Sequence, residues 1–292
     1  MLNFIKFIPL YFLISALFLV PGIISLGLYG LQPAIDFTGG SLLEVQITPE
    51  ANVTVNESAI RDTIPTDIDV ASVQTTADSY IIRTKPITSE QSSQIEQAMQ
   101  QKLGEVQEVR FETVGPTLGK ELLQKTYIAI AIAASAILFY VGYQFKELKY
   151  GVSAVLAMLH DTIIVVGAFS LLGHFYGVEV DTLFVTAVLT IMSFSVHDTI
   201  VVYDRIRESS HRHSSASFAS IANSAISETL ARSINNSMTI IFMLTALWLM
   251  GGETTKWFVF ALLIGTITGT YSSTFTATPI LVVWERFVNK RK

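Results

Sequence analysis

Two adjacent pairs of histidine and aspartate, His160-Asp161 and His197-Asp198, lie inside long apolar stretches of this sequence. A charged side chain near the centre of a bilayer costs at least ~2.5–3.5 kcal/mol to insert, so such residues are rare and usually functional. Carboxyl and imidazole groups both exchange protons readily. The two pairs are therefore candidates for functional residues inside a membrane.

Asp198 is the stronger of the two carboxylate candidates. Thr186, Thr190, Ser193 and His197 fall at i, i+4, i+7 and i+11, so they form one polar stripe along a helix. Asp198 lies about 100° round the helix from that stripe. We expect the stripe to face neighbouring helices or water and not lipid. Interhelical hydrogen bonds explain the Ser and Thr residues. They explain Asp198 less well, because an asparagine could make the same bond without the cost of an ionisable group.

A carboxylate inside a membrane needs a partner, and Arg232 is the candidate in this chain. Arg232, Asn236 and Thr239 form a second polar helical face at i, i+4 and i+7. Alone, Arg232 fits an anchor at the cytoplasmic edge of the membrane. Together with Asp198 in the preceding span, an ion pair or a proton relay is the better interpretation. Asp161 is a weaker candidate for a relay or tuning role.

Membrane helices must position these side chains. A span needs about 20 mostly apolar residues, because the hydrocarbon core is about 30 Å thick and a helix rises about 1.5 Å per residue. Six stretches have this length or approach it: Phe7–Gly30, Tyr127–Tyr143, Tyr150–Leu172, Thr182–Tyr203, Ile234–Met250 and Trp257–Val283. The first of these stretches is too long for a signal-peptide core and has no clear cleavage site, so we expect it to be retained.

The composition agrees with a membrane protein and excludes several other classes. Half of the 292 residues are hydrophobic and only 15% are charged, whereas soluble domains carry about a quarter charged residues. The absence of cysteine excludes disulfides, zinc-thiolate sites, iron–sulfur clusters and cysteine nucleophiles. We expect no metal and no cofactor. A net charge of −5 offers no basic field for nucleic acid.

Lysine and arginine residues near the span ends set the orientation. The short loops 173–181 and 251–256 carry only Lys256, so they lie on the outer side. An even number of spans then places both termini in the cytoplasm. The cytoplasmic side holds Lys6, Lys146, Lys149, Arg205, Arg207, Arg212, Arg286, Lys290, Arg291 and Lys292.

A polar domain outside the membrane separates the first two spans. Residues 31–125 carry 14 acidic and 7 basic residues and no histidine, so we expect this domain to bind and not to catalyse. The remaining residues carry 10 acidic and 12 basic residues. We therefore divide the chain into a first transmembrane helix (1–30), an extracytoplasmic domain (31–125) and transmembrane helices two to six (126–292).

The residue pattern of the outer domain predicts the order βαββαβ, which is typical of a ferredoxin-like α+β fold. Pro65 stops the first helix and Gly104 the second. A tight turn at Ala77-Asp78 joins the middle strands. The predicted elements are the strand Ser41–Ile47, the helix Glu57–Ile64, the strands Ala71–Thr75 and Ser79–Thr84, the helix Ser89–Leu103 and the strand Glu105–Val114.

The sixth span contains regularly spaced small residues, and the fourth span ends in a charged run. Gly265, Gly269, Ser273 and Ala277 recur every four residues in the sixth span, which predicts a seam for close helix packing. The run 204–208 ends the fourth span and fits a charged cytoplasmic stop. The sequence as a whole predicts a polytopic α-helical membrane protein with six transmembrane helices and a ferredoxin-like domain after the first.

Four motifs together resemble the SecF family of protein-export subunits, within the resistance–nodulation–division superfamily. The resemblance covers essentially the whole chain, in order. Inside these motifs stand Asp36, Phe37, Gly39 and Gly40, and later Asp204, Arg205, Arg207 and Glu208. The motifs are Ile35-Asp-Phe-Thr-Gly-Gly40, the run Asp198–Glu208, the run Glu228–Ser237, and Gly269–Ser273 followed by Pro279.

The resemblance implies a non-enzymatic subunit that forms a heterodimer with SecD in the bacterial cytoplasmic (inner) membrane. The pair would assist the SecYEG channel and the SecA motor in moving preproteins across that membrane with the proton gradient. Asp198 and Arg232 would line the proton path between the two subunits. His197 stands where the family usually has asparagine. A titratable neighbour could tune Asp198, which leaves the coupling ion open between proton and sodium.

Two other functions stay open at this point. One is a self-contained, homodimeric, proton-coupled transporter of the same superfamily, because one six-span unit is half of the usual twelve-span arrangement. The other is an intramembrane aspartyl protease that uses Asp161 and Asp198 as a carboxylate pair. Neither aspartate has a Gly-x-Gly-Asp context.

Overall fold

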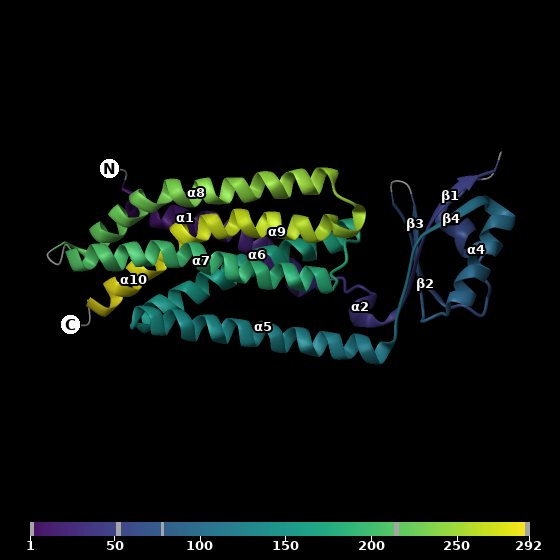
Figure 1. Ribbon diagram of the computed structural model, residues 1–292, viewed down its shortest axis with the longest axis horizontal. Helices are drawn as coiled ribbons and strands as arrows, with labels where there is room; N and C mark the ends of the chain where they lie inside the picture. The colour runs from purple at the N-terminus through teal and green to yellow at the C-terminus, as the bar shows by residue number, and fades with distance from the viewer. Residues whose placement is uncertain (1–2, 51–53, 77–78, 213–215, 290–292) are drawn as a thin grey trace. The chain divides into compact units, whose positions relative to one another are not determined.

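A computed structural model describes residues 3–50, 54–76, 79–212 and 216–289 of the chain. The chain divides into two compact units (Figure 1). The membrane unit comprises Met1–Gln32 and Ile128–Lys292, and the head unit comprises Pro33–Tyr127.

Within the described residues, six helices are long and apolar enough to cross a membrane, which confirms the predicted number. Two of the spans contain a change of helix type. The first begins as a 3-10 turn and the sixth contains a π turn, a local i→i+5 helix that is frequent at functional sites. The elements are η1 (Phe4–Phe7) with α1 (Ile8–Leu28), α5 (Pro116–Phe145), α6 (Leu148–Tyr176), α7 (Thr182–Arg212), α8 (Phe218–Met250), and α9 (Glu253–Ser272) with η2 (Ser273–Ala277) and α10 (Thr278–Asn289).

Several helices extend beyond the predicted spans. Helix α5 begins at Pro116 and not at Tyr127, and α8 begins at Phe218 and not at Ile234. The prediction followed apolar composition, which ends where a helix leaves the hydrocarbon. Backbone hydrogen bonds continue into water, provided that the helix end is satisfied. In α8 the Ser217 hydroxyl accepts a hydrogen bond from the Ser220 amide and caps the new first turn.

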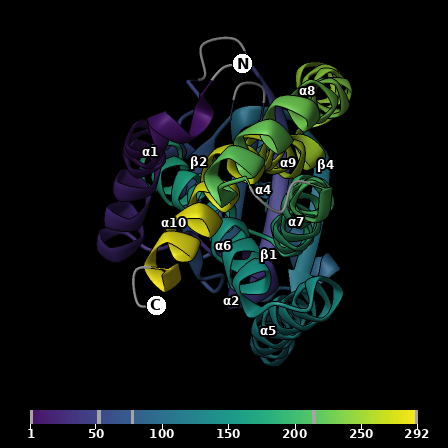
Figure 2. The ribbon, with the colours of Figure 1, turned by 90° about the vertical axis from the view of Figure 1, so that its left-hand side faces the viewer.

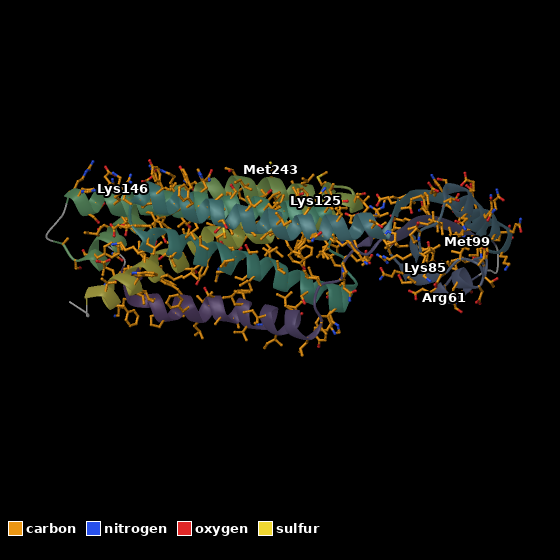
Figure 3. All side chains as sticks on the ribbon, turned by 90° about the horizontal axis from the view of Figure 1, so that it is seen from below. Arg61, Lys85, Met99, Lys125, Lys146 and Met243 are labelled. Carbon is orange, nitrogen blue, oxygen red and sulfur yellow. The ribbon has the colours of Figure 1, made fainter. Side chains whose placement is uncertain are left out.

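Three helices form the core of the membrane unit. Half of the most apolar segment is buried in α6, in α7 and in the sixth span, against 11–17% in α1, α5 and α8. Helices α6, α7 and α9 pack on one another, α1 packs on α6, and α8 packs on α7 and α9 (Figure 2). The outer helices turn apolar side chains such as Met243 outward (Figure 3). Most of the buried polar residues described in this bundle therefore lie on α6, on α7 and in the sixth span.

The head unit has the predicted ferredoxin-like arrangement. Its antiparallel sheet has the strand order β2-β3-β1-β4, so β3 lies between β1 and β2, and β1 lies between β3 and β4. Leu43 and Ile82 of the sheet pack against Ile95 and Met99 of the longer helix. The strands are β1 (Gly40–Pro49), β2 (Val70–Thr75), β3 (Tyr80–Thr84) and β4 (Gly104–Val114), and the helices are α2 (Ile35–Thr38), α3 (Glu57–Arg61) and α4 (Ser89–Leu103).

Small differences separate the predicted and observed head. Helix α3 ends at Arg61, three residues earlier than predicted, and turns lead to Pro65. The short helix α2 was not predicted, because four residues are too few to show a helical period. Helix α4 starts as predicted, through a capping box between Thr88 and Gln91. The predicted turn at Ala77-Asp78 lies outside the described residues.

Candidate functional site

Asp198 is buried at the contact between α7 and α8, with 4% of its surface exposed. Its Oδ2 atom accepts a hydrogen bond of 2.7 Å from the hydroxyl of Ser233. Ser233 is itself buried, so the bond lies inside the bundle. Ser233 was not among the predicted relay residues, although it follows Arg232 directly. A hydroxyl in this place satisfies the carboxylate without adding a second charge.

Arg232 lies on the other side of the same helical turn and does not reach Asp198. Adjacent helix residues point about 100° apart, so the turn that aims Ser233 at α7 aims Arg232 away. The Arg232 side chain is exposed. Among the described residues, no ion pair joins Arg232 to Asp198; the hydroxyl of Ser233 takes the place at the carboxylate that we expected for the guanidinium.

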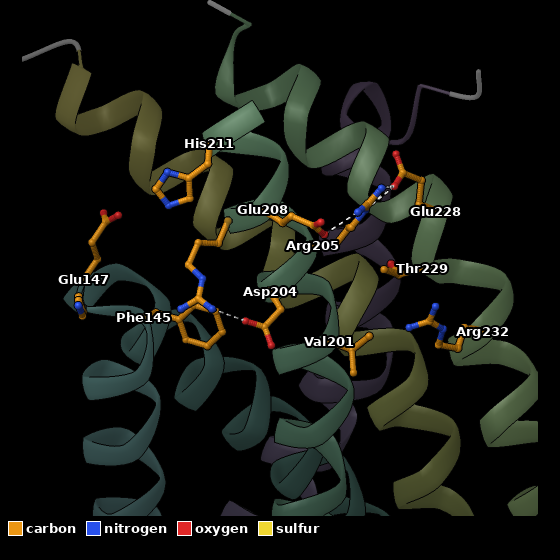
Figure 4. A pocket seen from close by; sticks show the side chains of 12 residues that line it. Phe145, Glu147, Val201, Asp204, Arg205, Glu208, His211, Glu228, Thr229 and Arg232 are labelled. Carbon is orange, nitrogen blue, oxygen red and sulfur yellow. Dashed lines mark hydrogen bonds and ion pairs between the residues drawn. The ribbon is translucent and has the colours of Figure 1, made fainter. Parts of the chain in front are cut away.

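Arg232 lines an open cavity of about 1270 Å³ at one end of α7 and α8 (Figure 4). Val201 and Thr229 also line it. Val201 follows Asp198 by three residues, and Thr229 precedes Ser233 by four, so the cavity begins one helical turn from the Asp198–Ser233 bond. The remaining lining residues are Phe145, Lys146, Glu147, Asp204, Arg205, Arg207, Glu208, His211 and Glu228.

The charged run 204–208 at the end of α7 contacts both α8 and the end of α5. Arg205 pairs with Glu208 of its own helix and with Glu228 of α8. Arg207 pairs with Asp204 at 3.0 Å and lies over the ring of Phe145. Figure 4 shows Arg205 beside the cavity. The run thus joins α7 to α8 and to the end of α5, which is more than a charged stop requires.

The polar stripe of α7 is exposed along its whole length. The four residues Thr186, Thr190, Ser193 and His197 all face outward, and no helix of the described chain covers them. Helix α8 shows a similar exposed polar face beside Arg232, with Asn235, Asn236 and Thr239. The two faces flank the Asp198–Ser233 contact. Polar side chains on membrane helices seldom face lipid, so this surface requires a protein or water beside it.

Asp161 occupies a separate buried place, between α6 and α9. It has no exposed surface. Its Oδ1 atom lies 2.9 Å from His160 Nδ1, and its Oδ2 atom accepts a bond of 2.5 Å from the Ser272 hydroxyl. The two aspartates therefore have different partners on different helices, and they do not form the shared pair that an aspartyl protease needs.

The small residues of the sixth span face α6 and α7. A methyl group added at Gly269 would lie 3.7 Å from Asp161 Oδ2 and 3.5 Å from the Cα atom of Ser195, and one at Gly265 would collide with Ile191. Ser273 is buried and begins the π turn. Gly269 thus lets α9 approach both the Asp161 carboxylate and α7.

The residues of the Gly39-Gly40 motif form a tight joint in the head unit. Phe37 is buried on α2, and Asp36 lies in the first turn of that helix. Gly39 and Gly40 have φ values of +74° and +131°, which side chains other than glycine rarely adopt. A Cβ atom at Gly39 would lie 2.7 Å from Pro116, the first residue of α5. Gly39 and Gly40 thus allow a close approach of the backbone at this joint.

The described residues contain no group of three potential metal ligands among His, Cys, Asp and Glu. What the membrane unit offers instead are two buried carboxylates, each bound to a hydroxyl group. Such groups can take up and release protons.

Comparison with known proteins decides the family. The chain matches the family described as "Protein export membrane protein SecD/SecF, C-terminal" over residues 94–287, and the SecD/SecF GG motif over residues 24–51. The protein translocase subunit SecF of Thermobaculum terrenum is 41% identical over 98% of this chain and 94% of its own length. That of Anaerolinea thermophila is 39% identical over the same shares. This chain belongs to the SecF family.

Solved structures agree with the fold of this SecF-family chain. The crystal structure of SecDF from Thermus thermophilus, described as a translocon-associated membrane protein, has a TM-score of 0.85 and 29% identity over 98% of this chain. SecDF in a super-membrane-facing form has a TM-score of 0.72 and 27% identity over 99%. The chain spans 39% of the length of each of these SecDF chains. The matched GG motif includes Gly39 and Gly40, whose tight joint is described above.

Proposed function

We propose that this SecF-family chain works as an accessory subunit of the Sec translocase, in a heterodimer with SecD. The pair promotes the movement of preproteins across the bacterial cytoplasmic membrane, through the SecYEG channel and with the SecA motor, and draws on the proton gradient. Both termini and the run at residues 204–212 lie in the cytoplasm, and the head lies outside. The distribution of lysine and arginine supports this orientation.

The exposed polar surface on α7 and α8 carries the proposal. Transmembrane polar residues are stable when they pair with another helix or line water, and no helix among the described residues covers these. A second membrane subunit can cover them, and the SecDF chains are far longer than this one. SecD is therefore the proposed partner at this surface, directly over the Asp198–Ser233 contact.

Asp198 is the proposed proton carrier. It lies beside the partner surface and one helical turn from the cavity that Arg232 lines. A proton that arrives through the cavity reaches the carboxylate after that turn, and Ser233 continues to donate to Oδ2 in either charge state. Arg232 stabilises negative charge along the path from its exposed position and needs no direct bond to Asp198. His197, exposed next to Asp198, faces the partner and tunes the carboxylate.

Export from reconstituted vesicles that contain SecD tests this function. The variant Asp198→Asn keeps the shape of the side chain and removes its proton exchange, so we expect export to lose its dependence on the proton gradient while SecD still co-purifies. Asp69→Asn, the same substitution at an exposed head residue, is the matched control and should leave export unchanged. Unimpaired gradient-dependent export by Asp198→Asn would refute the relay. Purification with a second copy and not with SecD would instead support a homodimeric transporter.

A further inference from the structure

The proposed function leaves a buried titratable group without a role. Asp161 lies between α6 and α9, whereas Asp198 lies between α7 and α8, and each carboxylate has its own hydroxyl donor. Asp161 is bound on both oxygens, by His160 at Oδ1 and by Ser272 at Oδ2. This set of contacts orients the carboxylate fully inside the protein.

One ring nitrogen of His160 makes no hydrogen bond within the described residues. His160 is 94% buried, with 6% of its surface exposed. Its Nδ1 atom faces Asp161, while its Nε2 atom is buried and has no hydrogen-bond partner in the described part of the chain. Buried polar atoms are nearly always paired, and an exception points to a functional role or to a bound ion. The imidazole thus has one nitrogen on the carboxylate and one available to a ligand.

Within the described residues, the hydrogen-bond partners of this cluster add no further charge. Ser272 of α9 binds Asp161, and a Cβ atom added at Gly269 of α9 would lie 3.7 Å from Asp161 Oδ2 and 3.5 Å from the Cα atom of Ser195 on α7. No hydrogen bond or ion pair joins Asp161 or His160 to any titratable or charged side chain described on the elements packed against α6. These side chains are Tyr11 on α1, His197, Asp198, Tyr203, Asp204, Arg205, Arg207, Glu208, His211 and Arg212 on α7, Lys256 and Tyr271 on α9, and Glu285 and Arg286 on α10.

A proton is the ligand that fits this cluster, on the grounds of charge and of donor chemistry. With an ionised carboxylate and a neutral imidazole the cluster has a net charge of −1, and one bound proton makes it neutral, which the low-dielectric interior favours. A hard metal cation would need six or more oxygen ligands. Here one carboxylate oxygen faces a ring nitrogen, the other a hydroxyl, and the described residues contain no set of three metal ligands.

We infer that His160, Asp161 and Ser272 form a second proton-binding site in the membrane unit, separate from Asp198. A proton that binds Nε2 of His160 displaces the Nδ1 proton onto Oδ1 of Asp161. The imidazole ends neutral with its hydrogen on Nε2, and the carboxyl group ends neutral. Release follows the reverse order. The inference extends the proposed proton-coupled function but does not depend on where Asp198 sends its proton.

Ser272 connects this site to the π turn of the sixth span. Ser272 is the last residue of α9, and the π turn Ser273–Ala277 follows it. The far end of the turn is held by Tyr203, whose hydroxyl donates to the carbonyl of Ala277 at 3.3 Å. A neutral Asp161 accepts the Ser272 bond less strongly than a charged one, since bonds to charged groups are about twice as strong. Protonation therefore loosens the attachment at the start of the π turn.

Infrared difference spectroscopy on the full chain with SecD in liposomes tests the site. The measurement compares acid with alkaline pH and follows the carbonyl stretch of protonated carboxyl groups. We expect Asp161→Asn to lose one titrating band that the wild-type protein has, and Asp198→Asn to lose a different one. The Asp198 band, still present in Asp161→Asn, shows that this variant is folded.

A second variant tests the relay through histidine. His160→Gln keeps a hydrogen-bonding side chain but cannot pass a proton from one end to the other, so the Asp161 band should move to a different pH midpoint. Identical titrating bands in Asp161→Asn and the wild-type protein would overturn the inference. So would an unmoved Asp161 band in His160→Gln, or a band that disappears when sodium replaces potassium, which would indicate a cation site. Failure of Asp198→Asn to affect export would leave these readouts intact and would count against the proposed function alone.

Discussion

The crossing of α1 and α6 gives the sharpest prediction about stability. Gly22 and Gly167 meet there with their backbones in contact. A Cβ atom added at Gly167 would lie 2.5 Å from the Cα atom of Gly22 and 3.0 Å from its carbonyl carbon. Carbon atoms pack at about 3.5–4.0 Å, so Gly167→Ala forces the helices about 1–1.5 Å apart. Backbone atoms cannot rotate away as a flexible side chain can.

The size of the effect follows from three contributions. Overpacking a tight contact costs about 1–3 kcal/mol. The separation also breaks the 2.7 Å hydrogen bond between the buried hydroxyls of Ser25 and Ser170, one turn further along both helices, at about 0.5–1.5 kcal/mol. Alanine in place of glycine returns about 1 kcal/mol of helix propensity. We expect Gly167→Ala to lower the free energy of unfolding by about 1–3 kcal/mol.

Thermal denaturation of the purified chain in detergent measures this loss. A decrease in Tm of about 2–10 °C corresponds to that range for a chain of this size. Gly27→Ala is the matched control, because it lies on α1, the helix that Gly167 contacts, with no atom within 4 Å of the added methyl group. It should leave Tm unchanged or raise it. Equal Tm values for Gly167→Ala and Gly27→Ala would refute the reasoning, and Ser25→Ala alone should account for the hydrogen-bond share.

Two further predictions concern the head unit. Gly40→Ala places a Cβ atom 2.8 Å from the carbonyl oxygen of Thr84, at a φ of +131°. We therefore expect the free energy of unfolding to fall by about 1–3 kcal/mol, as measured by denaturation of the full chain. Gly115→Ala, with no atom within 4 Å of the added Cβ atom, is the control and should be neutral. Burial, and then the carboxylate of Glu108, raises the pKa of Glu96 from 4.5 to about 6. Because the folded head holds this proton more tightly than the unfolded chain, the stabilisation is present below pH ~4.5 and is lost as pH rises to ~6. Glu96→Gln should flatten this dependence and stabilise the head at neutral pH by at most about 1 kcal/mol, since solvent screens the pair; an unchanged pH profile of Tm would contradict the assignment.

The spans and the head fold were predictable because their signals are local. The length of an apolar stretch decides whether a helix can cross a membrane, and alternation with Gly and Pro stops marks the strands and helices of the head. The same reasoning misjudged helix ends such as Pro116, where polar composition hides a helix that continues into water. It also missed α2, whose four residues are shorter than two helical turns.

The partners of the buried carboxylates were not predictable in this way. Sequence reasoning paired Asp198 with Arg232 by charge, but the rotation of α8 aims Ser233 at the carboxylate and leaves Arg232 exposed. Likewise the small-residue seam was visible in the sixth span, but not that Gly269 lies against Asp161. Helix rotation depends on the summed packing of all neighbours, and no single stretch of sequence contains that sum.

The sequence by itself determined which residue types enter the membrane, how many helices carry them, and that the acidic residues concentrate in the head, because these properties depend on composition and local period. Only the tertiary structure decided that the two aspartates bind separate hydroxyls, that His160 keeps one nitrogen unpaired, and that the polar stripe of α7 is exposed. The physical reason is that a hydrogen bond depends on the distance and direction between two atoms. A hydrogen bond requires atoms within about 3 Å, and residues 35 or 111 positions apart in the chain reach that distance only when the helices have packed.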